Sequence, residues 1–321
     1  MYFDTTYTNG VIAVKEKSLL KDKVLRLCEL GIDEAFRTLL DSGFGGGATD
    51  NVYEYEKLLQ AETSLLETFM QTYAPSEAEK RYFLLPKDFH NAKALFKARI
   101  LGEPADGMLV SQGFIEIDLL KNCIDGRNYD ALTSIPALAK ACKDCEESLE
   151  TDASGITIGS IFEKALYEEL LLSVKKQRGL KSLLTAKIDM TNVLTALRCG
   201  DETVAKTQYL KGGKIGEKKL QALFALDTDG IRRAFADTEY KTFIALCMTA
   251  KEKKLPYVEA EKFRDGYDLW TLEQRKFDLV KNEPFLYYVF RKKAEIANVR
   301  IVFACKLAGL DEQQIKNRLR K

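Results

Sequence analysis

Histidine is nearly absent from this chain, because His90 is the only one among 321 residues. A single histidine excludes a His-based catalytic triad and a metal centre built on histidine pairs. The glycine-rich run over residues 43–47 is not followed by Lys-Ser or Lys-Thr, so it does not match a phosphate-binding loop. We interpret this run as a flexible hinge between helices. The sequence therefore presents no catalytic constellation and implies no cofactor.

Long apolar runs are also missing, and no stretch approaches the roughly 18 apolar residues of a membrane-spanning helix. The most tempting segment, Ile301–Cys305, is flanked by Arg300 and Lys306. Residues 1–10 lack the basic and apolar regions of a secretory signal. We expect neither a spanning helix nor a signal peptide.

Neither charge is in clear excess, since the chain has 49 Lys+Arg residues and 48 Asp+Glu residues. No overall field therefore draws the molecule to nucleic acid or to anionic lipid. The seven cysteines are irregularly spaced and do not form a disulfide framework. Cys142 and Cys145 form a CxxC pair, but no second pair completes a metal site.

Proline is rare as well, with six in the chain, and apolar residues recur at intervals of three and four positions. The segments from Tyr55 to Phe69 and from Ile161 to Leu170 show this spacing. Such a period is typical of amphipathic helices, whereas alternating strand-like runs are scarce. The sequence predicts an all-α fold.

Two short patterns recur about every hundred residues. The first is an acidic residue three positions before an asparagine, and it occurs in the pairs Asp88 and Asn91, Asp189 and Asn192, and Glu295 and Asn298. Each pair lies in a predicted helix that ends near a glycine, namely Gly102, Gly200 or Gly309. The second pattern is a Gly-x-Ile triplet that begins at Gly10, Gly113 and Gly213. Their shared order and period predict an internal repeat.

This repeat divides the chain into three similar helical units, which we place at residues 1–105, 106–205 and 206–321. Units of this size cannot each bury both faces of their helices, so they are expected to pack together and share a core. Three units suit a compact, roughly three-fold arrangement.

The repeated acid and asparagine are predicted to have structural roles. Asp88 and Asp189 are expected to cap the first turn of a helix by accepting its free amide hydrogens. The asparagines lie one turn further along an otherwise apolar face, where their amides need hydrogen-bonding partners. Ligand binding by these residues is the alternative that the sequence leaves open.

Local basic clusters are the candidates for a partner surface. They comprise Lys214, Lys218 and Lys219, then Arg291, Lys292 and Lys293, and finally the basic residues of 316–321. Aromatic residues are not interleaved with them, which argues against a nucleic-acid site. Each cluster is either a solvated face or a patch that contacts an acidic protein or lipid headgroups.

The last segment, residues 283–321, carries a resemblance to a known family. It contains Glu-x-x-Asn-Val-Arg ending at Arg300, then Lys306-x-x-Gly309-Leu310, and a closing Ile315-Lys316-x-x-Leu319. This string resembles the C-terminal end of the C subunits of V-type ATPases/ATP synthases, which are related to the d subunit of the eukaryotic enzymes. The Asp88 and Asp189 segments extend the resemblance more weakly, and Leu194 departs from it where the other two units have Lys93 and Arg300.

The resemblance implies a non-catalytic central-stalk protein, shaped as a funnel of three similar helical domains. Its expected partners are the central-shaft subunits and the membrane proteolipid rotor ring, on the cytoplasmic side of the cell membrane. There it would transmit torque for coupled ATP turnover and ion transport. Two alternatives remain: a helical-repeat scaffold of another complex, and a helical enzyme whose site is hidden in the sequence.

Overall fold

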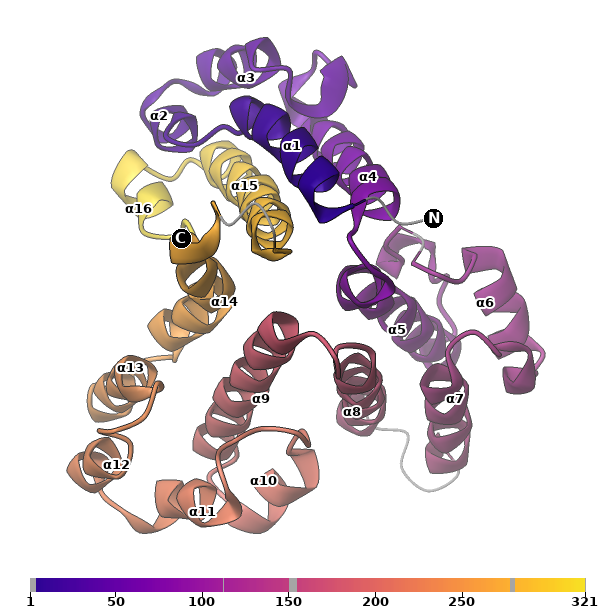
Figure 1. Ribbon diagram of the computed structural model, residues 1–321, viewed down its shortest axis with the longest axis vertical. Coiled ribbons are helices and arrows are strands. Elements are labelled where there is room, and N and C mark those ends of the chain that lie inside the picture. Colours follow the sequence, from indigo (N-terminus) through magenta and orange to yellow (C-terminus); the bar gives the residue numbers. More distant parts are fainter. Residues whose placement is uncertain (1–3, 112, 150–154, 278–280, 321) are drawn as a thin grey trace. The chain divides into compact units, whose positions relative to one another are not determined.

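The described residues of the computed structural model are 4–111, 113–149, 155–277 and 281–320. Every regular element among them is a helix, which confirms the all-α prediction (Figure 1). The chain forms two compact units, one from residues 1–76 and 261–321 and the other from residues 77–260.

The first unit is built around a helix from the C-terminal part of the sequence, α15 (Glu283–Leu307). This helix packs against α1 (Thr5–Lys15), α2 (Lys23–Glu29), α3 (Ile32–Asp41) and α4 (Tyr55–Tyr73). The short α16 (Glu312–Lys316) also contacts α15, and the residues of α14 (Val258–Leu272) from Glu261 onward belong to this unit. Segments far apart in the sequence thus share one core.

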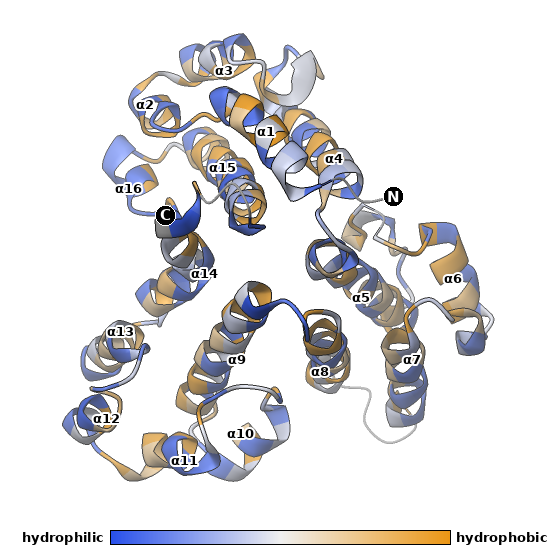
Figure 2. Cartoon of the chain, in the orientation of Figure 1, coloured by the Kyte–Doolittle hydropathy of each residue, from blue (hydrophilic) through white to orange (hydrophobic). Residues whose placement is uncertain are grey.

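Stacked and edge-on aromatic rings pack in that core. The ring centroids of Phe69 and Phe285 lie 5.8 Å apart, and Phe303 contacts both Phe36 and Tyr55 at 5.8 Å. Offset and edge-on pairs at this separation add stabilisation beyond the area that they bury. Most of these helices carry both hydrophobic and hydrophilic residues, as Figure 2 shows. A helix of this kind is stabilised by burying its hydrophobic side against another helix.

The second unit begins with α5 (Glu77–Leu101), which packs against α8 (Gly155–Ser173). Around them lie α6 (Ile117–Asp125) and α7 (Pro136–Leu149), and Phe96 of α5 contacts Phe162 of α8 at 5.5 Å. The helix α9 (Arg178–Cys199) packs against α10 (Glu202–Gln208) and α11 (Glu217–Ala225). The remaining helices are α12 (Thr228–Ala234) and α13 (Lys241–Glu252), which contact each other.

The predicted glycine stops are confirmed. The long helices α5, α9 and α15 end at Leu101, Cys199 and Leu307, and each is followed within two residues by Gly102, Gly200 or Gly309. These glycines have φ values of 67°, 67° and 74°, a left-handed conformation that a side chain disfavours.

The predicted capping role of the aspartates is wrong. α5 begins eleven residues before Asp88 and continues through Pro86, and Asp189 lies eleven residues inside α9. Both carboxylates therefore sit in the middle of a helix, where every nearby amide already has an intrahelical partner. Gly10 also differs from the other two Gly-x-Ile positions, because it lies inside α1 whereas Gly113 and Gly213 precede α6 and α11.

Candidate functional site

The two recurring patterns meet in space. In α5, both carboxylate oxygens of Asp88 accept from the backbone N–H of Phe114, at 3.1 and 2.9 Å, and Oδ1 also accepts from Ile115 N at 3.0 Å. One turn on, Asn91 accepts from Val110 N at 2.9 Å and donates to Val110 O at 3.2 Å. The acid-x-x-Asn motif thus holds the returning backbone that contains the Gly-x-Ile triplet.

The same arrangement recurs in α9. Asp189 accepts from Lys214 N and Ile215 N, both at 2.9 Å, and Asn192 exchanges two hydrogen bonds with Leu210 at 2.9 and 2.8 Å. Asp189 has a third donor, the hydroxyl of Tyr240 at 2.6 Å. We call each such arrangement a backbone clamp, meaning an acid and an asparagine on one helix that bind backbone groups from outside that helix.

The third clamp, in α15, binds two segments that are far apart in the sequence. Asn298 exchanges two hydrogen bonds of 2.8 Å with Arg320, whereas Glu295 accepts from Lys21 N at 3.1 Å. In the first two clamps the acid and the asparagine hold positions only a few residues apart. Here they hold segments from opposite parts of the chain, and both lie in the first unit.

Close approach explains the glycines of the second and third triplets, Gly113 and Gly213. A Cβ atom on Gly113 would lie 2.4 Å from Asp88 Oδ2, and one on Gly213 would lie 2.2 Å from Asp189 Oδ1. Separations this short do not occur between such atoms, so the carboxylate or the turn would have to shift. The carboxylate leaves no room for a side chain at either position.

We predict that Gly213→Ala lowers the free energy of unfolding by about 2 kcal/mol, since it displaces a carboxylate with three donors. Gly216→Ala is the matched control, because a Cβ atom there meets nothing within 4 Å. Urea unfolding of both variants measures the difference. Equal midpoints for the two would contradict the steric account.

Burial raises the pKa of Asp88 to about 6, against its ordinary value of 3.8, although the N–H groups of Phe114 and Ile115 and the charge of Lys87 oppose the rise. The folded state therefore binds a proton more tightly than the unfolded chain does. Between about pH 4 and pH 6 the charge on Asp88 makes folding progressively less favourable.

We therefore expect the stability of the wild type, measured relative to Asp88→Asn, to fall as the pH rises from about 4 to about 6. The difference corresponds to about 3 kcal/mol at most and should stay constant above about pH 7. Denaturant unfolding at a series of pH values measures it, and the comparison cancels the other titrating groups. A relative stability that rises over this range would contradict the assignment.

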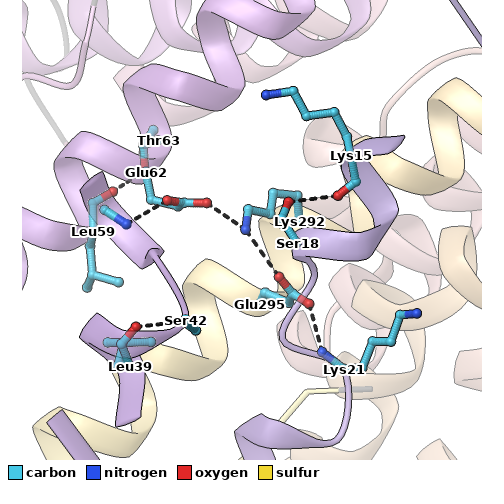
Figure 3. A network of polar contacts seen from close by, with 11 residues as sticks. Lys15, Ser18, Lys21, Leu39, Ser42, Leu59, Glu62, Thr63, Lys292 and Glu295 are labelled. Carbon is cyan, nitrogen blue, oxygen red and sulfur yellow. Dashed lines mark hydrogen bonds and ion pairs between the residues drawn. The ribbon is translucent and has the colours of Figure 1, made fainter. Parts of the chain in front are cut away.

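A buried ion network occupies the first unit, as Figure 3 shows. The ammonium of Lys292 lies 2.5 Å from Glu62 Oε1 and 3.4 Å from Glu295 Oε2. Glu62 also accepts from Gly45 N at 2.7 Å, and all three charged residues are buried, Lys292 being only 5% exposed. Burial raises the pKa of Glu295, against the opposing charge of Lys292.

This network corrects two predictions. Lys292 cannot belong to an exposed partner patch, because it is buried and its ammonium group pairs with two carboxylates inside the protein. The glycine run is not a free hinge, since Gly45 is buried against Leu58 and its N–H binds Glu62. The run does connect α3 with α4, and left-handed φ values at Gly43 and Gly45 allow its tight path.

The other predicted basic residues lie at or near the surface. Lys214, Lys218 and Lys219 are exposed and line a hollow of about 520 Å³. Lys214 Nζ lies 3.2 Å from Glu239 Oε1, and Lys219 Nζ lies 5.5 Å from the ring centre of Phe235. In the first unit Arg291 is half-buried and Lys293 is exposed.

Arg300, the last predicted motif residue, forms a two-pronged ion pair with Glu56 of α4. Its Nε lies 3.0 Å from Oε1 and its Nη2 lies 2.9 Å from Oε2. Leu194, at the corresponding place in the second motif, is buried. The pair joins α15 to α4 at the surface, where such a contact adds at most about 1 kcal/mol.

The clamp partners Lys21 and Tyr240, and the network residue Glu62, were missed from the sequence. One signal could have found the clamps, namely the nearly constant separation of 25 and 24 residues between Asp88 and Gly113 and between Asp189 and Gly213. No comparable spacing points to Tyr240, Lys21 or Glu62.

The remaining residues that could carry chemistry are the cysteine pair and His90. The thiols of Cys142 and Cys145 are buried, and burial raises the pKa of Cys145 to about 11. His90 contacts Met108 O at 3.0 Å. Among the described residues, no group of three or more His, Cys, Asp or Glu side chains is arranged to hold a metal ion. The clamps bind the protein's own backbone.

These features describe a helical structural protein whose repeated motif organises its own chain. The profile of the ATP synthase (C/AC39) subunit family matches residues 8–318. The chain therefore belongs to this family, the C subunits of V/A-type ATP synthases. As a member of it, the chain is a structural, non-catalytic part of such a complex, whose partners lie within that complex.

Curated relatives agree over most of the chain. The C subunit of the A-type ATP synthase of Methanosarcina acetivorans is 25% identical, covering 96% of this chain and 90% of its own length. The C subunit of the V-type sodium ATPase of Enterococcus hirae is 22% identical, with coverage of 84% and 82%. The C subunit of the V-type ATP synthase of Thermus thermophilus is also 22% identical, with coverage of 67% and 69%.

Proposed function

We propose that this chain is the central-stalk protein that links the soluble shaft of a V/A-type rotary ATPase to its membrane proteolipid ring. In that place it transmits torque between ATP turnover and ion transport, as a peripheral component on the cytoplasmic side of the membrane. The observation that carries the proposal is the family match over residues 8–318, which spans both compact units.

Local stiffness supports this role. A part that transmits torque must not yield within itself, and close-packed helices resist deformation. The three backbone clamps add hydrogen bonds that join each long helix to a segment 18 or more residues away in sequence. The buried Lys292 network ties α15 to α4 and to the segment before α2 in the same manner.

We also propose the three-unit division at residues 1–105, 106–205 and 206–321 and its pseudo-three-fold, funnel-like arrangement. Support comes from the recurrence of the clamp on α5, α9 and α15. The proposed unit at residues 106–205 is the candidate for different partner contacts, because it has Leu194 where the other two proposed units have Lys93 and Arg300. The exposed patch at Lys214, Lys218 and Lys219 is a candidate partner surface, and so is exposed Lys293 with the half-buried Arg291.

Among the described residues, no helix combines the length and the apolar character that crossing a membrane requires. The proposed attachment to the ring therefore rests on surface contacts with other subunits. Such a junction needs matched surfaces of moderate area if the soluble and membrane parts are to separate and rejoin.

The proposal is tested by tagging the chain and purifying it from detergent-solubilised membranes. We expect the shaft and proteolipid subunits to copurify, and deletion of the chain to abolish ATP-driven ion transport while the soluble part still hydrolyses ATP. Recovery with an unrelated assembly would favour the alternative, a helical-repeat scaffold of another complex. Unchanged ion transport without the chain would refute the coupling role.

A further inference from the structure

The only tryptophan of the chain, Trp270, lies on the surface of the first unit with 69% of its area exposed. It extends a line of aromatic rings along α14. The ring centroids of Phe263 and Tyr267 lie 6.2 Å apart, and those of Tyr267 and Trp270 lie 5.9 Å apart. The line begins half-buried at Phe263 and ends in solvent at Trp270.

Phe277 is a further exposed ring just beyond the end of α14. The turn Glu273–Arg275 follows α14 without a break, and Lys276 still has helical dihedral angles. Phe277 follows this helical stretch, seven residues after Trp270. Phe277 is 76% exposed. We call Tyr267, Trp270 and Phe277 the aromatic stripe.

The exposed end of the stripe is held in place by the protein. Lys276 lies between two rings, with its Nζ 5.2 Å from the ring centre of Phe277 and 5.1 Å from that of Tyr287 in α15. It also forms an ion pair with Glu273. A cation over an aromatic face stabilises the ring position, so this contact restrains Phe277 while its ring stays exposed to solvent.

Charge indicates the chemistry of the partner. Among the described residues, Arg275 is exposed next to Lys276, and Lys276 and Arg291 both lower the pKa of the nearby carboxylate of Glu273. A surface with surplus positive charge around exposed rings is complementary to apolar side chains bordered by carboxylates.

The number of cations favours a protein over a bilayer. Recognition of anionic lipid takes clusters of about four to eight basic residues, and the described residues named above offer three beside a carboxylate. Tryptophan and arginine are the residues most enriched at the energetic centres of protein interfaces.

We propose that the aromatic stripe, with Arg275 and Arg291, is the docking site for an acidic segment of another subunit of the rotary complex. This inference rests on the proposed function and names the surface that it uses. Trp270 and Phe277 insert between apolar side chains of the partner, and the two arginines pair with its carboxylates.

The test uses the full chain and the remainder of the rotary complex, purified from cells that lack this chain. We expect Trp270 fluorescence to shift to shorter wavelength on assembly. Trp270→Ala and Phe277→Ala should each raise the dissociation constant roughly 30-fold. Tyr53→Ala is the matched control, because Tyr53 is 77% exposed but belongs to no stripe, and it should change the constant by less than about twofold.

Added salt should weaken binding of the wild type more than that of Arg275→Gln, since the variant has one cation fewer. Both exposed-ring variants should melt like the wild type, which separates lost docking from lost folding. If the wild type rejoins the complex and both ring variants do so equally well, this inference fails and the proposed function stands. If the wild type itself does not rejoin, the proposed function fails.

A second measurement tests whether the aromatic stripe binds lipid rather than another subunit. If vesicles of phosphatidylcholine and phosphatidylserine shift Trp270 fluorescence as strongly as the complex does, the stripe contacts the bilayer and the inference is overturned. No shift with vesicles, together with a shift on assembly, supports it.

Discussion

Lys292→Met is expected to lower the free energy of unfolding by about 4 kcal/mol, the largest effect expected of any single substitution proposed for this chain. The substitution removes the cation that lies 2.5 Å from Glu62 and 3.4 Å from Glu295 and leaves two buried carboxylates facing each other. Breaking a buried ion pair from one side costs more than the pair contributes, because the remaining charge has lost its water as well as its partner. Urea unfolding monitored by circular dichroism measures the loss.

Two further variants make this expectation specific. Lys293→Met changes an exposed neighbour on the same helix and should alter the stability by less than about 0.5 kcal/mol. The triple variant Glu62→Gln, Lys292→Met, Glu295→Gln removes every charge of the network and should recover most of the loss. If Lys292→Met unfolds at the wild-type midpoint, removing Lys292 leaves no unpaired buried charge, and this explanation of its role is wrong.

Asp189→Ala is expected to cost about 3 kcal/mol, since three donors lose their acceptor together. They are the N–H groups of Lys214 and Ile215 and the hydroxyl of Tyr240. Asp88→Ala removes the acceptor of two backbone donors only, and burial already opposes the charge on Asp88, so its loss should be smaller, about 1 to 2 kcal/mol.

The control for this comparison is Asp201→Ala. Asp201 caps α10 from outside by accepting from Val204 N at 2.9 Å, and losing such a cap costs about 1 kcal/mol. The expected order of destabilisation is therefore Asp189 first, and Asp88 or Asp201 after it. Calorimetric melting of the three variants gives the order. A larger loss for Asp201→Ala than for Asp189→Ala would show that the clamp contributes little.

The sequence predicted those features of the fold that depend on residues close together in the chain. Helical spacing and the glycines after each long helix depend on neighbouring residues, so the all-α fold and the stops at Gly102, Gly200 and Gly309 could be predicted. Asp88 and Asp189 were misplaced as caps, because Pro86 and the residues before Asp189 suggested a helix start that tertiary packing overrode.

Long-range contacts were harder to foresee. The acid-x-x-Asn and Gly-x-Ile patterns were both visible, but nothing local says that Asp88 reaches Phe114 or that Asp189 reaches Lys214. Lys292 was taken for a surface residue because Arg291 and Lys293 flank it. Its true surroundings include Glu62, 230 residues earlier, and only the packing of α4 on α15 brings the two together.

The divided third clamp bears on the order in which the chain folds. Lys21 and Glu295 are 274 residues apart, and the first unit cannot close until residues 261–321 have been made. The second unit, residues 77–260, is continuous, and synthesis of its 184 residues takes on the order of 10 to 40 seconds. During that time α1 to α4 lack α15, whose aromatic residues complete their core. On the ribosome the second unit can therefore fold first, while the apolar faces that α1 to α4 bury against α15 stay uncovered until α15 has been made.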